Sequence, residues 1–308
     1  MEHFPAMKAA SAAIKGHALG ILAIVLWGVM FPVGTELMAD GRISPMALGF
    51  WRYALASLAL LPLSALAAPP GKRCPRRAGD FAACAAFGLV GATAMCGLLF
   101  KAQETVSSLN ASLLEAYVPI LVMLLLRPVT GPLPWRKWFA VVLGLAGTML
   151  VLQAVTLDGV RLSRLGIGDF HIFLSGLSWA VYTAFARPWT KRLGSLVFTA
   201  WSAVFGAAGF AAAVKLQGGT LALPGAWRIW GMVAFLAWGP AACAYWAWNA
   251  APKYIPVHSL AFLEYFAPAV AALAAWLGRG EPVTWLQVLG LLVILAAARL
   301  QTGGPEKG

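Results

Sequence analysis

Charged residues are what this sequence has least of. Only 11% of its 308 residues are Asp, Glu, Lys or Arg, whereas about a quarter are charged in soluble domains. The hydrophobic share is 61%, and the mean hydropathy is +0.78. This composition excludes a soluble globular domain and predicts an integral membrane protein.

Cysteine is also scarce, and the four cysteines form no C-x-x-C pair. The spacing therefore indicates neither a zinc site nor a disulfide framework. The sequence also lacks an H-E-x-x-H motif and an aspartate pair within its apolar runs. We expect no metal and no cofactor. Long polar loops are missing too, which argues against a soluble domain and against a receptor or scaffold role.

What the sequence has instead is long apolar runs. Ten of them can cross about 30 Å of hydrocarbon as helices. They are too long for barrel strands, and hydrocarbon offers no partner for free backbone groups. The first run has no convincing cleavage site after it, so we interpret it as a retained helix. The runs cover residues 17–38, 45–68, 81–100, 108–126, 137–154, 168–186, 196–216, 228–250, 257–277 and 283–299.

The net charge of +12 could indicate a nucleic-acid partner. However, the basic residues sort by loop: most lie on the side that both termini share with the even-numbered loops, as membrane topology requires. We therefore expect both termini to be cytoplasmic, and a lipid bilayer rather than nucleic acid as the large partner. The densest clusters are Lys72, Arg73, Arg76 and Arg77, and then Arg187, Lys191 and Arg192.

The chain also contains an internal repeat. The segment AIVLWGVMF around Trp27 resembles FLSGLSWAVYT around Trp179, and AAFGLVGA at Ala85 resembles VAFLAWGP at Val233. The copies lie about 150 positions apart, which divides the chain into residues 1–155 and 156–308. Each copy carries five apolar runs, so the second copy enters the membrane from the opposite face. Inverted repeats of this kind bind ligands near the midplane and support alternating access.

Each copy places one glutamate in an apolar run. Residues 112–121 read SLLEAYVPIL, and residues 261–270 read AFLEYFAPAV. A charge at the centre of a membrane helix costs about 2.5–3.5 kcal/mol on insertion scales, so such residues usually mark ion or substrate pathways. Pro119 and Pro268 each follow the glutamate by four positions, where the missing N–H frees the carbonyl of Glu115 or Glu264. We expect a cluster of acceptors for a proton, a small cation or an ammonium group.

Arg52 breaks the symmetry between the copies, because its counterpart is Ser202. It is predicted at the same depth as Glu115, and an ion pair between them would keep Glu115 charged. Glu264 has no evident basic partner in its own copy, and burial without an opposite charge disfavours an ionised carboxyl group. Our hypothesis is that Glu264 titrates and that Glu115 is more structural.

Aromatic side chains supply the rest of a predicted pocket. Trp27 and Trp179 fall at equivalent mid-span positions, and Tyr245, Trp246 and Asn249 crowd the eighth run. Beside a carboxylate, such a group can hold an apolar or cationic side chain. The same run contains Gly239-Pro240, which predicts a hinge or local unwinding.

An intramembrane serine protease is the alternative from another class. Gly176-Leu177-Ser178 fits a loose G-x-S pattern, with His258 as the candidate base. A catalytic dyad would not explain the duplication, and we expect the protein not to be an enzyme.

Several of these segments together resemble the drug/metabolite transporter superfamily, and specifically its EamA type. They are Leu26-Trp27-Gly28, Ser44-Pro45 with Arg52-Tyr53, the helices of Pro119 and Pro268, and the closing run from Gly280-Glu281-Pro282 to Gly290. The resemblance implies ten helices in two five-helix repeats. It also implies export of small metabolites, often amino acids, across the bacterial cytoplasmic membrane. Many members carry the ninth-helix glutamate next to the proline, whereas here it lies four residues earlier.

The sequence thus predicts an all-α, ten-helix inverted-repeat carrier that exports amino acids or related small molecules by alternating access. Proton exchange and proton-independent facilitation are both open, as are a monomer and a homodimer. Efflux of hydrophobic cations or drugs is the alternative within transport.

Overall fold

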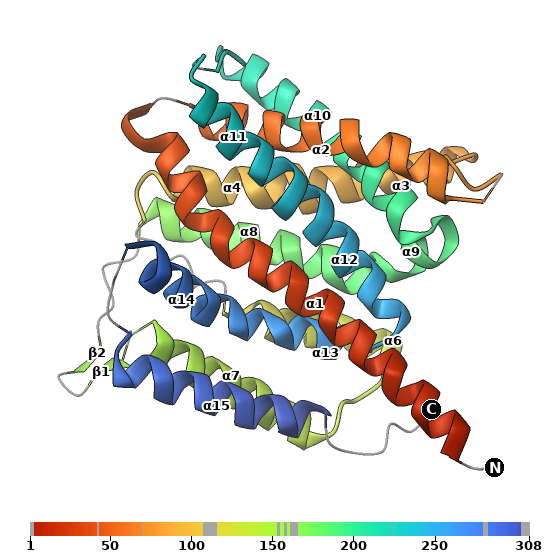
Figure 1. The fold of residues 1–308 in the computed structure, drawn as a ribbon, viewed down its shortest axis with the longest axis vertical. Coiled ribbons are helices and arrows are strands. Elements are labelled where there is room, and N and C mark those ends of the chain that lie inside the picture. The colour runs from red at the N-terminus through yellow and green to blue at the C-terminus, as the bar shows by residue number, and fades with distance from the viewer. Residues whose placement is uncertain are drawn as a thin grey trace.

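The computed structural model describes residues 3–41, 43–69, 71–106, 116–152, 155–156, 159–160, 166–223, 225–279 and 283–302. Within these ranges the chain forms one bundle of helices that run between the same two ends (Figure 1). Helix α1 begins, and α15 ends, at the right-hand end of this view. We call it the basic end, for the reason given below, and the other end the distal end.

The part of the chain before residue 155 forms helices that cross the bundle in alternating directions. Helix α2 starts at a defined cap: the hydroxyl of Ser44 accepts the N–H of Ala47 at 3.2 Å, and Pro45 occupies the first turn, where a proline is tolerated. The helices are α1 (His3–Met38), α2 (Pro45–Ala67), α3 (Ala78–Gly88), α4 (Met95–Ala102), α6 (Val118–Thr130) and α7 (Trp135–Val151). A 3-10 turn covers Ala39–Gly41.

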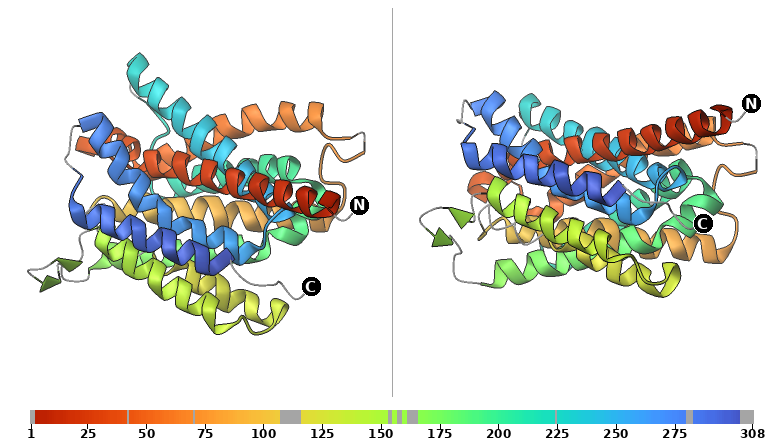
Figure 2. Two further views of the ribbon diagram at one scale, coloured as in Figure 1. Left: turned by 60° about the horizontal axis from the view of Figure 1, so that its bottom comes forward. Right: turned by 90° about the horizontal axis from the view of Figure 1, so that it is seen from below.

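Two antiparallel strands of two residues each, β1 (Val155–Thr156) and β2 (Gly159–Val160), form a hairpin that projects from the distal end (Figures 1 and 2). The helices that follow are α8 (Ile167–Phe185), α9 (Arg187–Leu193), α10 (Ser195–Leu216), α11 (Trp227–Leu236), α12 (Ala244–Ala250), α13 (Val257–Phe262), α14 (Ala267–Arg279) and α15 (Trp285–Thr302). Short 3-10 segments cover Ala251–Lys253 and Leu263–Phe266. Helix α9 and the hairpin have no counterpart among the predicted apolar runs.

Two spanning helices contain a π-helical segment. Leu89–Ala94 joins α3 to α4, and Ala237–Cys243 joins α11 to α12. The second segment includes Gly239 and Pro240, the predicted hinge, and the first lies at the equivalent place in the other sequence copy. Since π-helical turns are rare and often found at functional sites, both segments are relevant to the site described below.

Helices from the two sequence copies pack side by side. Helix α10 lies along α2, α15 along α7, and α8 along α4 (Figure 1). Glycines permit the closest approaches: a Cβ atom at Gly290 would lie 2.6 Å from the carbonyl oxygen of Gly147. Small residues at such contacts are typical of packed membrane helices. The largest cluster of buried apolar side chains accordingly contains residues of both copies.

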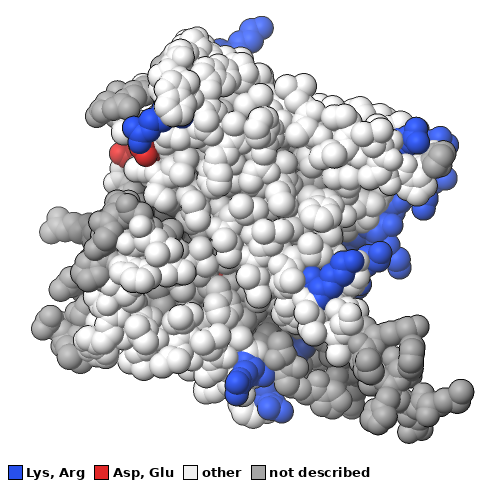
Figure 3. Space-filling model, viewed as in Figure 1, with Lys and Arg blue, Asp and Glu red and all other residues white. Residues whose placement is uncertain are grey.

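The surface is consistent with a membrane setting. In Figure 3 most Lys and Arg atoms lie toward the basic end, where Figure 1 places the α2–α3 connection and α9, while the middle of the visible face is uncharged among the described residues. Five helical segments are long and apolar enough to span a bilayer, and two more are shorter and apolar. The predicted fourth run is described only from residue 116, so the count of ten stays a prediction. The five segments are Ala10–Met38, Pro45–Ala67, Ala78–Ala102, Ser195–Leu216 and Trp227–Lys253.

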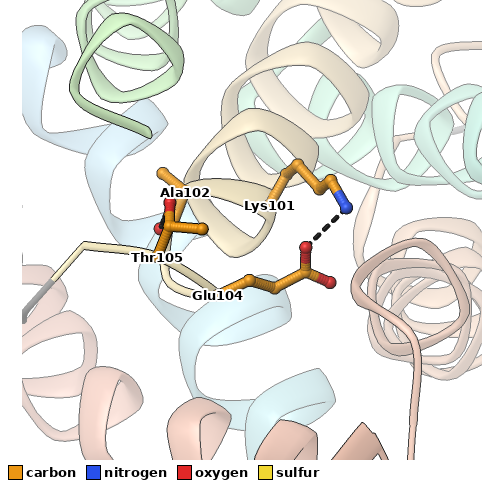
Figure 4. Close-up of polar contacts among 4 residues, drawn as sticks. All are labelled: Lys101, Ala102, Glu104 and Thr105. Carbon is orange, nitrogen blue, oxygen red and sulfur yellow. Dashed lines mark hydrogen bonds and ion pairs between the residues drawn. The ribbon is translucent and has the colours of Figure 1, made fainter. Parts of the chain in front are cut away.

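An exposed ion pair closes α4 at the distal end (Figure 4). Lys101 Nζ lies 2.5 Å from Glu104 Oε2, and the Thr105 hydroxyl donates to the carbonyl of Ala102 at 3.3 Å. A lysine in the last turn also complements the helix dipole. Both charged side chains are solvent-accessible, so the pair contributes little stability, and Glu104 is a suitable position for a control substitution.

Candidate functional site

A cavity of about 100 Å³ lies between helices from both sequence copies. Since a water molecule needs about 10–15 Å³ of such space, the cavity has room for several waters or a small organic molecule. Its wall is largely apolar with a few polar groups, as is usual in ligand sites. The lining residues are Ile24, Trp27, Met30, Arg52, Met95, Leu99, Ala116, Val118, Pro119, Thr148, Trp179, Glu264, Tyr265, Ala267 and Pro268.

The two equivalent tryptophans meet in the wall of this cavity. The rings of Trp27 and Trp179 contact edge to face, with centroids 5.1 Å apart. Each indole N–H is used differently: Trp27 donates to the carbonyl of Pro240 at 2.9 Å, and Trp179 donates to Glu264 Oε1 at 2.7 Å. Trp27 thereby ties α1 to the π-helical segment of the other copy, whereas Trp179 positions the carboxyl group.

Glu264 lies in the 3-10 segment Leu263–Phe266, directly before α14, and is half-buried. The sequence-based expectation that Pro268 leaves the Glu264 carbonyl unpaired is wrong. The N–H of Ala267 donates to that carbonyl, because the tighter 3-10 turn replaces the missing i+4 donor with the i+3 N–H. The acceptor in the cavity wall is therefore the side-chain carboxyl group.

Arg52 is fully buried and lines the same cavity. Its Nη1 donates to Cys96 Sγ at 3.3 Å, and its guanidinium carbon lies 5.3 Å from the Tyr53 ring centroid and 5.8 Å from that of Phe100. Among the described residues, its Nε and Nη2 atoms have no hydrogen-bond partner. The proposed partner Glu115 lies outside the described residues, so that ion pair stays a prediction.

A second buried network supports Arg52. The Tyr53 hydroxyl donates to the Tyr245 hydroxyl at 2.9 Å, and the Tyr245 hydroxyl donates to the carbonyl of Gly91 at 2.6 Å. Tyr53 also lies 3.3 Å from the Cys96 sulfur that Arg52 contacts. This chain of contacts joins α2 to both halves of the bundle and ends in the π-helical segment Leu89–Ala94.

The predicted residues of the eighth run lie beside the cavity rather than in its wall. Tyr245 lines a smaller adjacent cavity, with Tyr182 and Thr199. Asn249 is buried and donates to the Tyr182 hydroxyl at 2.7 Å and to Thr199 Oγ1 at 2.9 Å. Trp246 is half-buried and lines neither cavity. Of the predicted structural residues, Pro119 and Pro268 line the main cavity.

Two polar residues of the cavity wall were missed by the sequence reasoning. Thr148 in α7 and Tyr265 next to Glu264 are each 1% exposed, and among the described residues their hydroxyl oxygens have no hydrogen-bond partner. A single hydroxyl group in an apolar helix usually bonds to the backbone of its own helix, so the sequence around Thr148 does not indicate a ligand site. Tyr265 could have been found from its position directly after the buried glutamate.

The residues of the alternative protease reading are engaged elsewhere. The Ser178 hydroxyl donates to the carbonyl of Leu174 within its own helix at 2.9 Å, and His258 Nε2 lies 2.6 Å from Lys137 Nζ. A hydroxyl bonded to its own helix in this way is common in membrane helices.

A bundle of apolar helices around a cavity, with a carboxyl and a guanidinium group in its wall, indicates a multi-pass membrane protein, and the family match identifies the class as a transporter. The model of the EamA-like transporter family matches residues 14–153 and 166–302. The chain belongs to this family, within the drug/metabolite transporter superfamily.

Similar curated proteins are described as transporters or as a member of a related group. The uncharacterized transporters YyaM and YdfC of Bacillus subtilis are 22% and 27% identical, over 85% and 88% of this chain and 86% of each relative. A chloroplastic WAT1-related protein of Arabidopsis thaliana is 28% identical over 59% of this chain and 44% of its own length. A crystal structure with the same fold matches with a TM-score of 0.76 at 21% identity, covering 94% of this chain and 98% of that one.

Proposed function

We propose that this protein is a secondary transporter that exports small metabolites, amino acids or related compounds, by alternating access. The observation that carries the proposal is the cavity between the two sequence copies, with the Glu264 carboxyl group held by Trp179 in its wall. A half-buried carboxyl group in a membrane protein is costly unless it serves a pathway. In the proposed arrangement, ten helices form two inverted five-helix halves around this cavity.

The wall of the cavity suits an amino-acid-sized molecule. The Glu264 carboxylate can accept hydrogen bonds from an ammonium group, and the rings of Trp27 and Trp179 beside it can contact either a cation or an apolar side chain.

Proton exchange would follow from competition at Glu264. The indole N–H of Trp179 can donate to a carboxylate or to the carbonyl oxygen of the protonated acid, so this contact persists in both states. A proton arriving from one side would release an ammonium group bound at the carboxylate. The Glu264 carboxylate would then bind the substrate and a proton in turn.

The proposed orientation places the basic end in the cytoplasm. Lys72, Arg73, Arg76 and Arg77 in the α2–α3 connection are exposed, and so are Arg187, Lys191 and Arg192 around α9. Cytoplasmic loops are enriched in Lys and Arg. Both termini would then lie in the cytoplasm, and the membrane would be the cytoplasmic membrane of a bacterium.

The test is counterflow of labelled amino acids in proteoliposomes, with and without a pH gradient. We expect Glu264→Gln to lower exchange about tenfold or more, since the neutral amide cannot pair with an ammonium group or carry a proton. The control is Glu104→Gln, at the exposed ion pair, which should match the wild type. No flux of any amino acid in the wild type would contradict the proposal, and an unchanged pH dependence in Glu264→Gln would refute the role of that residue.

Efflux of hydrophobic cations is the second candidate, favoured by the aromatic rings beside Glu264. The same vesicles can be loaded with labelled tetraphenylphosphonium. Flux of this cation without flux of any amino acid would favour the second candidate over the first.

A further inference from the structure

The cavity wall contains buried polar atoms that no described residue satisfies. They are Nε and Nη2 of Arg52, Oγ1 of Thr148 and the hydroxyl of Tyr265. The three side chains are 0%, 1% and 1% exposed. Leaving a buried donor unpaired costs about 1–3 kcal/mol, and more for a charged group. Three such side chains around one small cavity therefore indicate a site that a ligand completes.

The free atoms of Arg52 form one edge of its guanidinium group. Nη1 already donates to Cys96 Sγ, and the Tyr53 and Phe100 rings pack on the group. Nε and Nη2 present two parallel N–H donors, which is the geometry that grips the two oxygens of a carboxylate. The contacts of Nη1 hold the guanidinium group in place, and among the described residues no acceptor occupies this edge.

The two hydroxyl groups share one wall of the cavity. The Tyr265 ring packs on α7 at Gly144, where a Cβ atom would lie 2.7 Å from the ring. Thr148 is four residues further along α7 and therefore lies on the same helix face. Each hydroxyl can donate one hydrogen bond to an anionic oxygen.

We propose that Arg52, Thr148 and Tyr265 form a carboxylate subsite in the cavity. Arg52 donates two parallel hydrogen bonds to the carboxylate, and the hydroxyls of Thr148 and Tyr265 donate to its remaining lone pairs. The inference rests on the proposed function and narrows its substrate: with Glu264 in the same wall, the transported molecule carries a carboxylate and an ammonium group. Purely cationic amines are disfavoured, because they offer no acceptor for the N–H groups of Arg52.

Binding to the purified full-length protein in lipid nanodiscs tests the subsite separately from transport. Three matched probes are L-leucine, L-leucinamide and isoamylamine, which share a side chain and differ at the carboxylate. The panel also contains the other amino acids, and isovalerate as a carboxylate without an ammonium group. We expect the carboxylates to raise the melting temperature of the wild type, and L-leucinamide and isoamylamine to have little effect. If no carboxylate in the panel raises it, the subsite does not exist.

Substitutions then assign the binding to the three side chains. We expect Arg52→Gln to weaken binding of the best carboxylate about 10- to 100-fold and Arg52→Lys to restore only part of it, since a lysine lacks the parallel pair of donors. Thr148→Val and Tyr265→Phe should each weaken it about three- to tenfold. Glu104→Gln should leave it unchanged. If Arg52→Gln does not fold, the two hydroxyl variants carry the test.

The outcomes separate this subsite from the alternatives. Unchanged binding of the best carboxylate in a folded Arg52→Gln variant would mean that Arg52 only supports the structure, and the proposal would be wrong. Wild-type binding in Thr148→Val and Tyr265→Phe together would also overturn it. Carboxylate binding without any amino-acid flux would retain the subsite and refute the proposed export.

Discussion

The two sequence copies place different chemistry at equivalent positions. The first copy contributes Arg52, Tyr53 and Cys96, a buried cation with two of its contacts. The corresponding residues of the second copy are Ser202, Ala203 and Ala244, whereas the second copy contributes Glu264 to the cavity. The repeat counterpart of Glu264 is Glu115, which lies outside the described residues. The difference that the structure describes between the copies is therefore the buried cation of the first.

The π-helical segments offer the sharpest comparison of the halves. Gly91 and Gly239 are equivalent in the repeat, but a Cβ atom at Gly91 would lie 2.0 Å from the Tyr182 ring, while at Gly239 the nearest atom would be 3.5 Å away. Tyr182 cannot easily move, because Asn249 donates to its hydroxyl and its ring stacks on Trp179.

We therefore expect Gly91→Ala to destabilise the protein by about 1–3 kcal/mol or more, and Gly239→Ala to change stability by less than about 0.5 kcal/mol. The measurement is the rate of thermal inactivation of the purified protein in lipid. Equal rates for the two variants would show that the packing of the two segments does not differ as described.

The second comparison concerns ion pairs between the halves. Arg192 Nη2 lies 2.8 Å from Asp80 Oδ1, and the Asp80 side chain is only 5% exposed. Asp80 also accepts the N–H of Arg77 at the start of α3. We expect Asp80→Asn to destabilise the protein by about 1–3 kcal/mol, because it removes the negative charge that faces Arg192 from a buried position.

High salt should reduce this effect only in part, since the Asp80 side chain is buried whereas the Arg192 side chain is 43% exposed and therefore partly screened. Thermal inactivation of Asp80→Asn and the wild type in low and high salt measures both quantities. A destabilisation that disappears in high salt would place the pair at the surface.

Much of this arrangement could be predicted from the sequence. Trp27, Arg52, Pro119, Trp179, Glu264 and Pro268 were singled out from the apolar runs, and all of them line the cavity; their roles stay predictions. A charged residue in an apolar run, or an aromatic residue at equivalent positions of a repeat, can be identified from the sequence because it differs from its neighbours. The membrane-spanning character followed from hydropathy for the same reason.

The rest depended on three-dimensional detail. The π-helical segments leave no mark in hydropathy, because both helices are largely apolar on every face, so a change of the face by one residue does not alter the pattern. The Glu264 carbonyl was misjudged because a 3-10 turn can replace a missing donor. Thr148 and Tyr245 look alike as polar residues in apolar runs, and only the fold distinguishes a cavity wall from a buried network.

The equivalent tryptophans give a smaller predicted difference. Trp179→Phe removes the hydrogen bond to Glu264 but keeps an aromatic ring, so we expect about a three- to tenfold rise in the apparent KM for the transported amino acid. Trp27→Phe removes a hydrogen bond to the carbonyl of Pro240. It should lower the stability of the protein by about 1 kcal/mol and raise the KM less than Trp179→Phe does. Counterflow and thermal inactivation of both variants separate the two effects. A larger KM change in Trp27→Phe would reverse the assignment of the two rings.

The smallest effect is expected at the ion pair between Glu36 and Arg228, which lie 2.6 Å apart at the ends of α1 and α11. Arg228 is the repeat counterpart of Asp80, so a basic residue stands here where the other copy has an acid. The Glu36 and Arg228 side chains are 48% and 70% exposed, and exposed pairs contribute about 0–1 kcal/mol and weaken in salt. Glu36→Gln should therefore inactivate at nearly the wild-type rate, and any difference should vanish in high salt. If Glu36→Gln lost as much thermal stability as Asp80→Asn, the two ion pairs would contribute equally. The difference between the pair at the basic end and the pair at the distal end would then not exist.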